Sequence, residues 1–178
     1  METARRIVRE EGTQALTLGY LAQRAGVSKP ITYEHFETRS GLLVALAQQI
    51  DDRQVKVLFD ALEKARPQLS DIARTLADAY IHCYQVVGSE WQAMTAALKG
   101  NEEMDAVQQA LLDRYVDIYR DALAPYTALP KRELRLRCVA IVGAAEALVA
   151  AMARGSVGAA KAAQVLASLI ERWIASGA

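Results

Sequence analysis

Lys29, Tyr33 and His35 lie close together in the segment GVSKPITYEHF, which runs from Gly26 to Phe36. An ammonium group, a phenol hydroxyl and an imidazole are donors that bind phosphate oxygens and reach the edges of bases. The free backbone N–H groups of a helix start bind anions as well. These residue types at helical spacing predict a surface that binds nucleic acid. A solvated face of a small helical subdomain would explain the composition equally well.

Two short helices joined by a tight turn position this segment. Thr17 is expected to cap the first helix, and Gly26 can take the left-handed conformation that ends it. Ser28 then caps a second helix, with Pro30 in its first turn. Thr32 and Phe36 are four residues apart and share the face that Phe36 identifies as buried. The opposite face displays Lys29, Pro30, Ile31, Tyr33 and His35, and the whole pattern is that of a helix-turn-helix.

The chain as a whole is apolar enough to fold and carries no excess of charge. It has 178 residues, 52% of them hydrophobic, with 21 basic and 21 acidic side chains, so nucleic-acid binding must come from a local surface. Cys83 and Cys138 lie far apart without CxxC spacing, which favours a reducing compartment. The N-terminus is charged where a signal peptide is apolar, and no run is long and apolar enough to span a bilayer. We therefore expect a cytoplasmic protein.

Helical periodicity extends through almost the whole chain, and no segment alternates long enough to predict a sheet. The predicted fold is all-α, with an N-terminal three-helix helix-turn-helix subdomain over residues 1–38 and six helices over residues 39–178. Glycine and proline mark the expected helix ends. These breaks fall near Pro67, Gly88, Gly100, Pro125 and Gly155.

The two C-terminal helices predict a contact with a second copy of the chain. The segment from Cys138 to Ala153 is apolar on nearly every side, with Glu146 as its only charge, and the last helix is rich in small and apolar residues. Two such helices per subunit suggest a four-helix dimer seam, although an internal hairpin is the alternative. The partner of Glu146 is then a ligand cation, an arginine across the seam, or water. The expected interface residues are Ala145, Glu146, Val149, Ala163, Ala167, Ile170 and Trp173.

The segment LTLGYLAQRAGVSKPITYEHFETRSGLL, from Leu16 to Leu43, resembles the DNA-binding region of the TetR family of bacterial transcriptional repressors. The resemblance rests on the Ala-Gly-Val-Ser-Lys turn, the Tyr-x-His-Phe ending and the basic residue that opens the next helix. It covers roughly the first quarter of the chain. The first helix starts about a turn later than in the family pattern, so Ala4, Ile7 and Val8 must supply its buried face.

The resemblance implies a role for each matched residue. Thr17 and Tyr33 are expected to contact phosphates, and Lys29, Pro30 and Ile31 are expected to lie at the edge of the major groove. His35 and Arg39 are expected to hold the DNA backbone on the flank, with Ser28 at the start of the helix. Two positions depart from the pattern. Ile31 replaces a small hydroxyl residue, so the operator sequence is not inherited, and Thr32 replaces an apolar core residue, which is tolerable if its hydroxyl bonds to a helix carbonyl.

The resemblance also implies that the helices after Arg39 enclose an effector pocket, which makes residues 39–178 a ligand-binding and dimerisation domain. The expected function is a ligand-responsive regulator, a repressor that binds a palindromic operator as a homodimer and is released by a small apolar or aromatic effector. The alternative for each candidate wall residue is ordinary packing in the hydrophobic core. The candidates are Phe59, Tyr80, Cys83, Trp91, Met94, Tyr115 and Tyr119.

Nothing in the sequence predicts an enzyme, a cofactor or a metal site. His35 and His82 have no cysteine or carboxylate at metal-ligand spacing, and neither a glycine-rich phosphate loop nor a nucleophile elbow is present. The main alternative to a DNA-binding regulator is a helical protein-interaction module that does not bind DNA.

Overall fold

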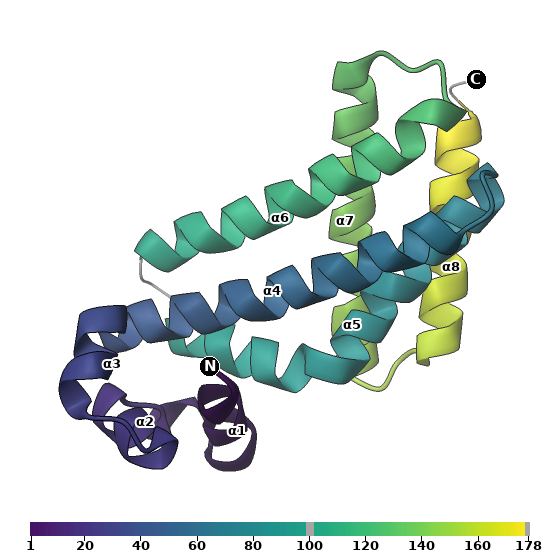
Figure 1. The fold of residues 1–178 in the computed structure, drawn as a ribbon. Coiled ribbons are helices and arrows are strands. Elements are labelled where there is room, and N and C mark those ends of the chain that lie inside the picture. Colours follow the sequence, from purple (N-terminus) through teal and green to yellow (C-terminus); the bar gives the residue numbers. More distant parts are fainter. Residues whose placement is uncertain (99–101, 177–178) are drawn as a thin grey trace. The chain divides into compact units, whose positions relative to one another are not determined.

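A computed structural model describes residues 1–98 and 102–176, and the elements in these ranges are helices, so the predicted all-α class is confirmed. Figure 1 shows their order along the chain. The α-helices are α1 (Glu2–Glu11), α2 (Leu18–Ala25), α3 (Lys29–Phe36), α4 (Arg39–Lys64), α5 (Leu69–Leu98), α6 (Glu102–Leu123), α7 (Lys131–Ala153) and α8 (Ala159–Ala175). Two short 3-10 turns, η1 (Thr13–Ala15) and η2 (Ala124–Tyr126), complete them.

The first two helices of the predicted helix-turn-helix end where the sequence indicates. The Thr17 hydroxyl accepts the Tyr20 N–H at 3.1 Å and so caps α2. Gly26 ends α2 in the left-handed conformation at φ 69°, where its N–H and that of Val27 bond back to the last turn. Ser28 precedes α3 in an extended conformation, and Pro30 lies in the first turn.

The turn between α3 and α4 depends on two residues with unusual backbone requirements. Glu37 has a φ of 57°, an uncommon value for a residue with a side chain. Gly41 lies so close to the preceding turn that a Cβ atom there would be 2.4 Å from the Phe36 carbonyl oxygen. The Thr38 hydroxyl accepts the Gly41 N–H at 2.9 Å and satisfies one free donor at the start of α4.

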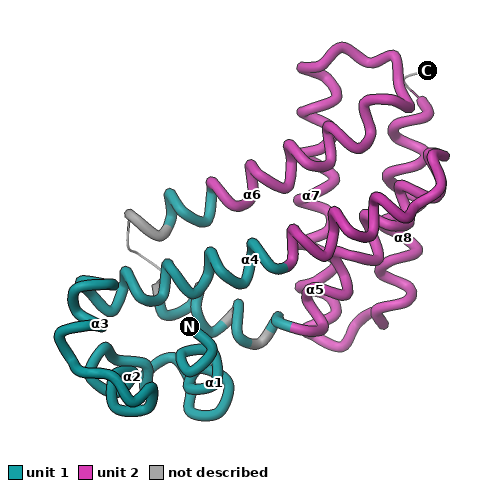
Figure 2. The backbone as a smooth tube through the Cα atoms, in the orientation of Figure 1, with its two compact units in different colours: residues 1–53, 87–109 teal, residues 54–86, 110–178 magenta. Residues whose placement is uncertain are grey.

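The chain divides into two compact units, coloured separately in Figure 2. Unit 1 comprises Met1–Arg53 and Val87–Gln109, and unit 2 comprises Gln54–Val86 and Ala110–Ala178. Helices α4, α5 and α6 each contribute residues to both units. These compact units therefore do not coincide with the predicted functional boundary between residues 38 and 39.

Unit 1 has its own small core. Ala4, Ile7 and Val8 supply the buried face of α1, as predicted. Leucines from α2 and from the first half of α4 complete the apolar interior. The buried residues of these two segments include Leu18, Leu21, Leu42, Leu43, Leu46 and Ile50.

Unit 2 contains the larger core, in which α7 and α8 run antiparallel beside each other (Figure 1). Cys138, Ile141 and Ala145 of α7 and Leu166 and Ile170 of α8 are fully buried in it. The apolar residues at helical spacing thus face the interior, as expected for amphipathic core helices.

One predicted helix end is wrong. Gly88 was expected to break a helix, but it is buried inside α5, which continues from Leu69 to Leu98. An isolated glycine costs a helix only about 1 kcal/mol relative to alanine, so packing can keep the helix intact across it. As a result, the region after residue 38 has five α-helices and the short η2 turn within the described ranges, where six helices were expected.

A second expectation, that no run is long and apolar enough to span a bilayer, is also wrong. Within residues 1–98 and 102–176, α7 is the one helix that meets the criterion by length and composition, with a mean hydropathy of 1.8 over its most apolar window. The buried side chains of α7 recur every three or four residues and pack in the core of unit 2. Core helices of soluble proteins meet the same criterion of length and composition.

Candidate nucleic-acid interface and ligand cavity

The face of α3 that was predicted to bind nucleic acid is exposed. Ile31 and Tyr33 each expose 53% of their surface, and Lys29, Pro30 and His35 are also exposed. Thr32, on the opposite side, is buried. The helix therefore presents one imidazole, one phenol hydroxyl, one ammonium group and two apolar groups to solvent.

Two hydroxyl residues at helix starts extend this face. Thr17 uses an oxygen lone pair to cap α2, which leaves its O–H free to donate to an anion. The exposed Ser28 precedes α3, and its side chain makes no capping bond. The exposed helix starts and their hydroxyls can thus donate to the same phosphate backbone.

Thr32 makes the hydrogen bonds that a hydroxyl in a core position needs. Its Oγ1 lies 2.9 Å from the Lys29 carbonyl oxygen and 3.1 Å from the Leu18 carbonyl oxygen. The hydroxyl has one hydrogen, which the two acceptors share: the Lys29 carbonyl belongs to α3 itself, and the Leu18 carbonyl belongs to the start of α2. The departure from the family pattern at this position therefore ties the two helices of the motif together.

Arg39, which was predicted to contact the DNA backbone, makes two hydrogen bonds to the backbone of unit 1. Its Nε donates to the Leu16 carbonyl oxygen at 2.9 Å, and its Nη2 donates to the Thr13 carbonyl oxygen at 2.6 Å. The guanidinium thereby satisfies backbone acceptors of the α1–α2 connection. These bonds give Arg39 a structural role in unit 1, and its predicted contact with the DNA backbone stays a prediction.

Four of the predicted wall residues meet at one small cavity in unit 2. Tyr80, Cys83, Tyr115 and Tyr119 line a cavity of only about 10 Å³, together with Gln54, Leu58 and Ala79. The Tyr80 and Tyr115 rings form an edge-to-face pair with centroids 5.9 Å apart. The Tyr119 hydroxyl donates to the Leu76 carbonyl oxygen at 3.1 Å, which fixes that wall.

Burial keeps the tyrosine side chains of this cavity uncharged. Burial raises the pKa of both Tyr80 and Tyr119 well above that of a free phenol, with a smaller contribution to Tyr80 from the nearby Glu146 carboxylate. Both phenols are therefore neutral at physiological pH. Ligand sites usually enclose about 300–1,000 Å³, so the walls of this cavity would have to move apart to admit any ligand larger than a water molecule.

Three of the predicted wall residues do not line this cavity. Phe59 exposes 49% of its surface on α4. Met94 is buried in the part of α5 that belongs to unit 1, and Trp91 lies in the same part. Gly88 was expected to break the helix beside Trp91, which made Trp91 a candidate wall residue. Because α5 is continuous, that argument for Trp91 no longer holds.

The predicted dimer residues separate into surface and core. Glu146 and Trp173 are exposed, and Val149, Ala163 and Ala167 are half-buried. Ala145 and Ile170 are fully buried in the unit 2 core, so they cannot contact a second copy and their assignment is wrong. The stripes of α7 and α8 that turn outward contain other apolar residues, which include Leu136, Val139 and Val165.

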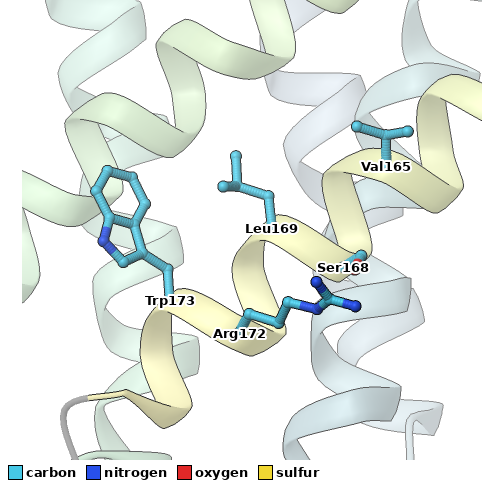
Figure 3. A pocket seen from close by; sticks show the side chains of 5 residues that line it. All are labelled: Val165, Ser168, Leu169, Arg172 and Trp173. Atoms are coloured by element: carbon cyan, nitrogen blue, oxygen red, sulfur yellow. The ribbon is translucent and has the colours of Figure 1, made fainter.

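A shallow groove runs along the outward side of α8 (Figure 3). Val165, Leu169 and Trp173 give it an apolar floor, and Ser168 and Arg172 lie along its polar side. On α7, Glu146 makes no hydrogen bond or ion pair with the described part of the chain. Partial burial raises the pKa of its carboxyl group.

Sequence reasoning missed a buried ion cluster in unit 1. Glu90 of α5 is 6% exposed and accepts hydrogen bonds from Arg5 and Arg9 of α1. Arginines four residues apart on α1 signal a basic stripe, but their partner is more than 80 residues away in the sequence. A second cluster joins Glu11, Tyr20 and Arg24 on the surface of α1 and α2.

Comparison with known proteins finds a family match over the N-terminal quarter of the chain. Residues 1–46 match the family model described as bacterial regulatory proteins, tetR family. No curated protein matches the chain significantly.

Several solved structures share the fold over nearly the whole chain. A TetR-like transcriptional regulator from Rhodococcus sp. RHA1 is 24% identical with a TM-score of 0.67, covering 98% of this chain and 92% of its own. A putative TetR-family transcriptional regulator from Rhodococcus sp. is 19% identical with a TM-score of 0.76, covering 97% and 95%. The fatty acid degradation regulator FadR from Bacillus halodurans is 17% identical with a TM-score of 0.72, covering 96% and 91%.

Proposed function

We propose that this TetR-family protein is a ligand-responsive transcriptional repressor that binds a palindromic operator as a homodimer through α3. The observation that carries the proposal is the exposed donor face of α3, which lies inside the segment that matches the family. A helix-turn-helix places its second helix in the major groove, where such side chains reach phosphates and base edges.

The exposed residues divide between positioning and sequence reading. We assign phosphate contacts to Thr17, Ser28 and Tyr33, whose hydroxyls lie at or near the two helix starts, and to His35 at the end of α3. We place Lys29, Pro30 and Ile31 at the edge of the major groove, because apolar groups at a helix start can contact thymine methyl groups. The exposed Ile31 makes this face less polar, so it is the main candidate for sequence preference.

A homodimer explains the outward apolar stripes of α7 and α8. Leu136 and Val139 expose 58% and 45% of their surface on α7, and the groove on α8 continues the apolar character. A two-fold dimer would cover both helices with their copies and would present two recognition helices. Successive major grooves accept them when they are about 34–36 Å apart.

The cavity in unit 2 is the proposed effector site. Three tyrosines and a cysteine favour a small apolar or aromatic ligand, and neutral phenols give it hydrogen bonds without charge. Such a ligand releases DNA only if it binds the DNA-incompetent state more tightly. The proposed compartment is the cytoplasm, where the operator is, with α7 covered by a second copy instead of lipid.

The proposal is tested by a gel-shift assay with competitor DNA over a salt series. A repressor gives a sequence-specific complex above a background whose affinity falls with salt. Tyr33→Phe should weaken binding to all DNA sequences by about three- to tenfold, since it removes one phosphate hydrogen bond. A folded parent protein that binds no duplex DNA would favour the alternative, a helical module that binds another protein through its apolar face.

A further inference from the structure

The connection between α3 and α4 is two residues long and contains a strained turn. Glu37 has a φ of 57° and a ψ of −55°, and the Thr38 N–H donates to the Phe36 carbonyl oxygen at 2.5 Å. This is a γ-turn with a positive φ, a conformation that is rare and strained for a residue with a side chain. Such strain persists only where the surrounding structure fixes the segment on both sides.

Both helices beside this turn are anchored within unit 1. The Thr32 hydroxyl of α3 lies 3.1 Å from the Leu18 carbonyl oxygen at the start of α2. On the other side of the turn, Arg39 donates to the Leu16 carbonyl oxygen, and Leu42 is fully buried. Because neither helix is free to move and lengthen the connection, the two residues between them take up the strain.

Gly41 lets the first turn of α4 lie directly against the end of α3. A Cβ atom at this position would be 2.4 Å from the Phe36 carbonyl oxygen, and real Cβ atoms essentially never come closer than 3.0 Å to another atom. That oxygen is also the acceptor of the γ-turn, so it cannot rotate away while the turn is intact. A side chain at position 41 therefore pushes the last residue of α3 away from α4.

We infer that Gly41 is a positioning residue for DNA binding, because the close approach that it permits sets the direction in which α3 presents Tyr33 and His35. This inference rests on the proposed function. Tyr33 and His35 lie in the last turn of α3, which a displaced Phe36 carries with it. A binding surface has to be held within about 0.5 Å of its productive geometry, and the displacement that a Cβ atom at position 41 requires is at least as large.

The strain at Glu37 can be separated from the close approach at Gly41. A glycine reaches positive φ without a steric penalty, so Glu37→Gly keeps the turn and removes its strain. This variant should unfold at an equal or higher urea concentration than the parent protein. It should bind the DNA site that the parent selects with an affinity within about twofold of the parent, since the carbonyl of Phe36 and the first turn of α4 are unchanged.

Gly41→Ala introduces the clash and tests the inference directly. It should lower affinity for the parent's DNA site by about tenfold or more, because the phosphate contacts of Tyr33 and His35 are displaced together. Hydrogen exchange of the amides of residues 34–37 should become about tenfold faster, because the last turn of α3 loses its fit on α4. Ser40→Ala, which removes only a hydroxyl group from the same turn of α4, is the control and should change neither measurement.

The double variant Glu37→Gly with Gly41→Ala distinguishes positioning from stability. A glycine at position 37 lets the Phe36 carbonyl rotate away from the new methyl group, so the urea midpoint should return to about that of the parent. The direction of α3 is then no longer fixed, and DNA affinity should stay at least about tenfold below that of the parent. A residue that acts only on stability would restore affinity and stability together.

The inference is overturned if Gly41→Ala binds DNA as tightly as the parent, or if affinity in the double variant recovers in step with the urea midpoint. A urea midpoint that does not recover in the double variant would contradict the clash with Phe36. A folded parent that binds no duplex DNA would contradict the proposed function instead, and the exchange rates of residues 34–37 then still decide whether Gly41 holds α3 in place.

Discussion

At the scale of single residues, Arg39 and Lys29 illustrate two roles for a cation in a DNA-binding unit. The Arg39 guanidinium is occupied by the Thr13 and Leu16 carbonyl oxygens, whereas Lys29 is exposed at the start of α3. Arg39→Ala should lower the free energy of unfolding by about 2 kcal/mol, because hydrogen bonds to charged groups contribute about 1.5–3 kcal/mol. Urea denaturation followed by circular dichroism measures the change.

Lys29→Ala is the matched control for Arg39→Ala. It should leave the urea midpoint within about 0.5 kcal/mol of the parent and reduce DNA affinity at low salt. If Arg39→Ala proves as stable as the parent and loses only DNA affinity, the structural assignment of Arg39 fails and the phosphate assignment from the family resemblance returns.

Glu146 gives the protein a pH dependence of stability. Partial burial raises the pKa of its carboxyl group in the folded state. Its contribution to stability is therefore present below the pKa of the unfolded chain, about 4.3, and is lost as the pH rises through the raised value. Glu146→Gln should match the parent near pH 4 and become the more stable protein as the pH approaches 7.

The measurement for Glu146 is the free energy of unfolding of both proteins from pH 4 to 7, at a protein concentration that holds the oligomeric state constant. Glu171→Gln on the exposed side of α8 serves as the control. Identical pH profiles for Glu146→Gln and the parent would show that burial does not perturb this carboxyl group.

At the scale of elements, α7 and α8 carry the proposed dimer. Val139→Lys places a charge on the exposed apolar stripe of α7 and should weaken self-association by about thirtyfold or more, the effect of losing a residue at the centre of an interface. Helical content should be unchanged, because the side chain is already 45% exposed. Analytical ultracentrifugation at micromolar concentration measures the association.

Two control variants are measured beside Val139→Lys, one at an exposed residue and one at a buried residue. Val57→Lys changes an equally exposed valine on α4 and should leave self-association unaltered. Ala145→Lys changes a fully buried residue of α7 and should unfold unit 2 before any effect on association can be seen. A monomeric parent protein would refute the proposed dimer.

Most of the elements could be predicted from local chemistry. Thr17, Gly26 and Pro30 mark the ends of α2 and α3 because capping and left-handed glycine act within a few residues. Gly88 misled the prediction, since only tertiary packing determines whether an isolated glycine breaks a helix. Ala145 was placed on the wrong side because α7, apolar on nearly every side, carries little signal for which stripe faces the core. For Ile170 the signal existed, since the buried residues Ala162, Leu166, Ile170 and Ile174 of α8 recur every four positions.

At the scale of the whole molecule, the two parts of the candidate site differ in how far sequence could predict them. The exposed face of α3 follows from one short segment and its spacing. The Glu90 cluster and the tyrosine cavity bring together residues from distant helices, which no local pattern reveals. Arg39 shows the same limit, because its carbonyl partners more than 20 residues away decide its role.

The central claim is that the exposed face of α3 makes this chain a sequence-specific DNA-binding dimer. Selection of binding sites from a random duplex library, followed by affinity measurement at physiological salt, tests it most directly. The account predicts a two-fold symmetric site bound at least about 10³-fold more tightly than random duplex, with a preference that changes in an Ile31→Ser variant. No enrichment by folded, dimeric protein, or a site that Ile31→Ser leaves unchanged, would contradict it.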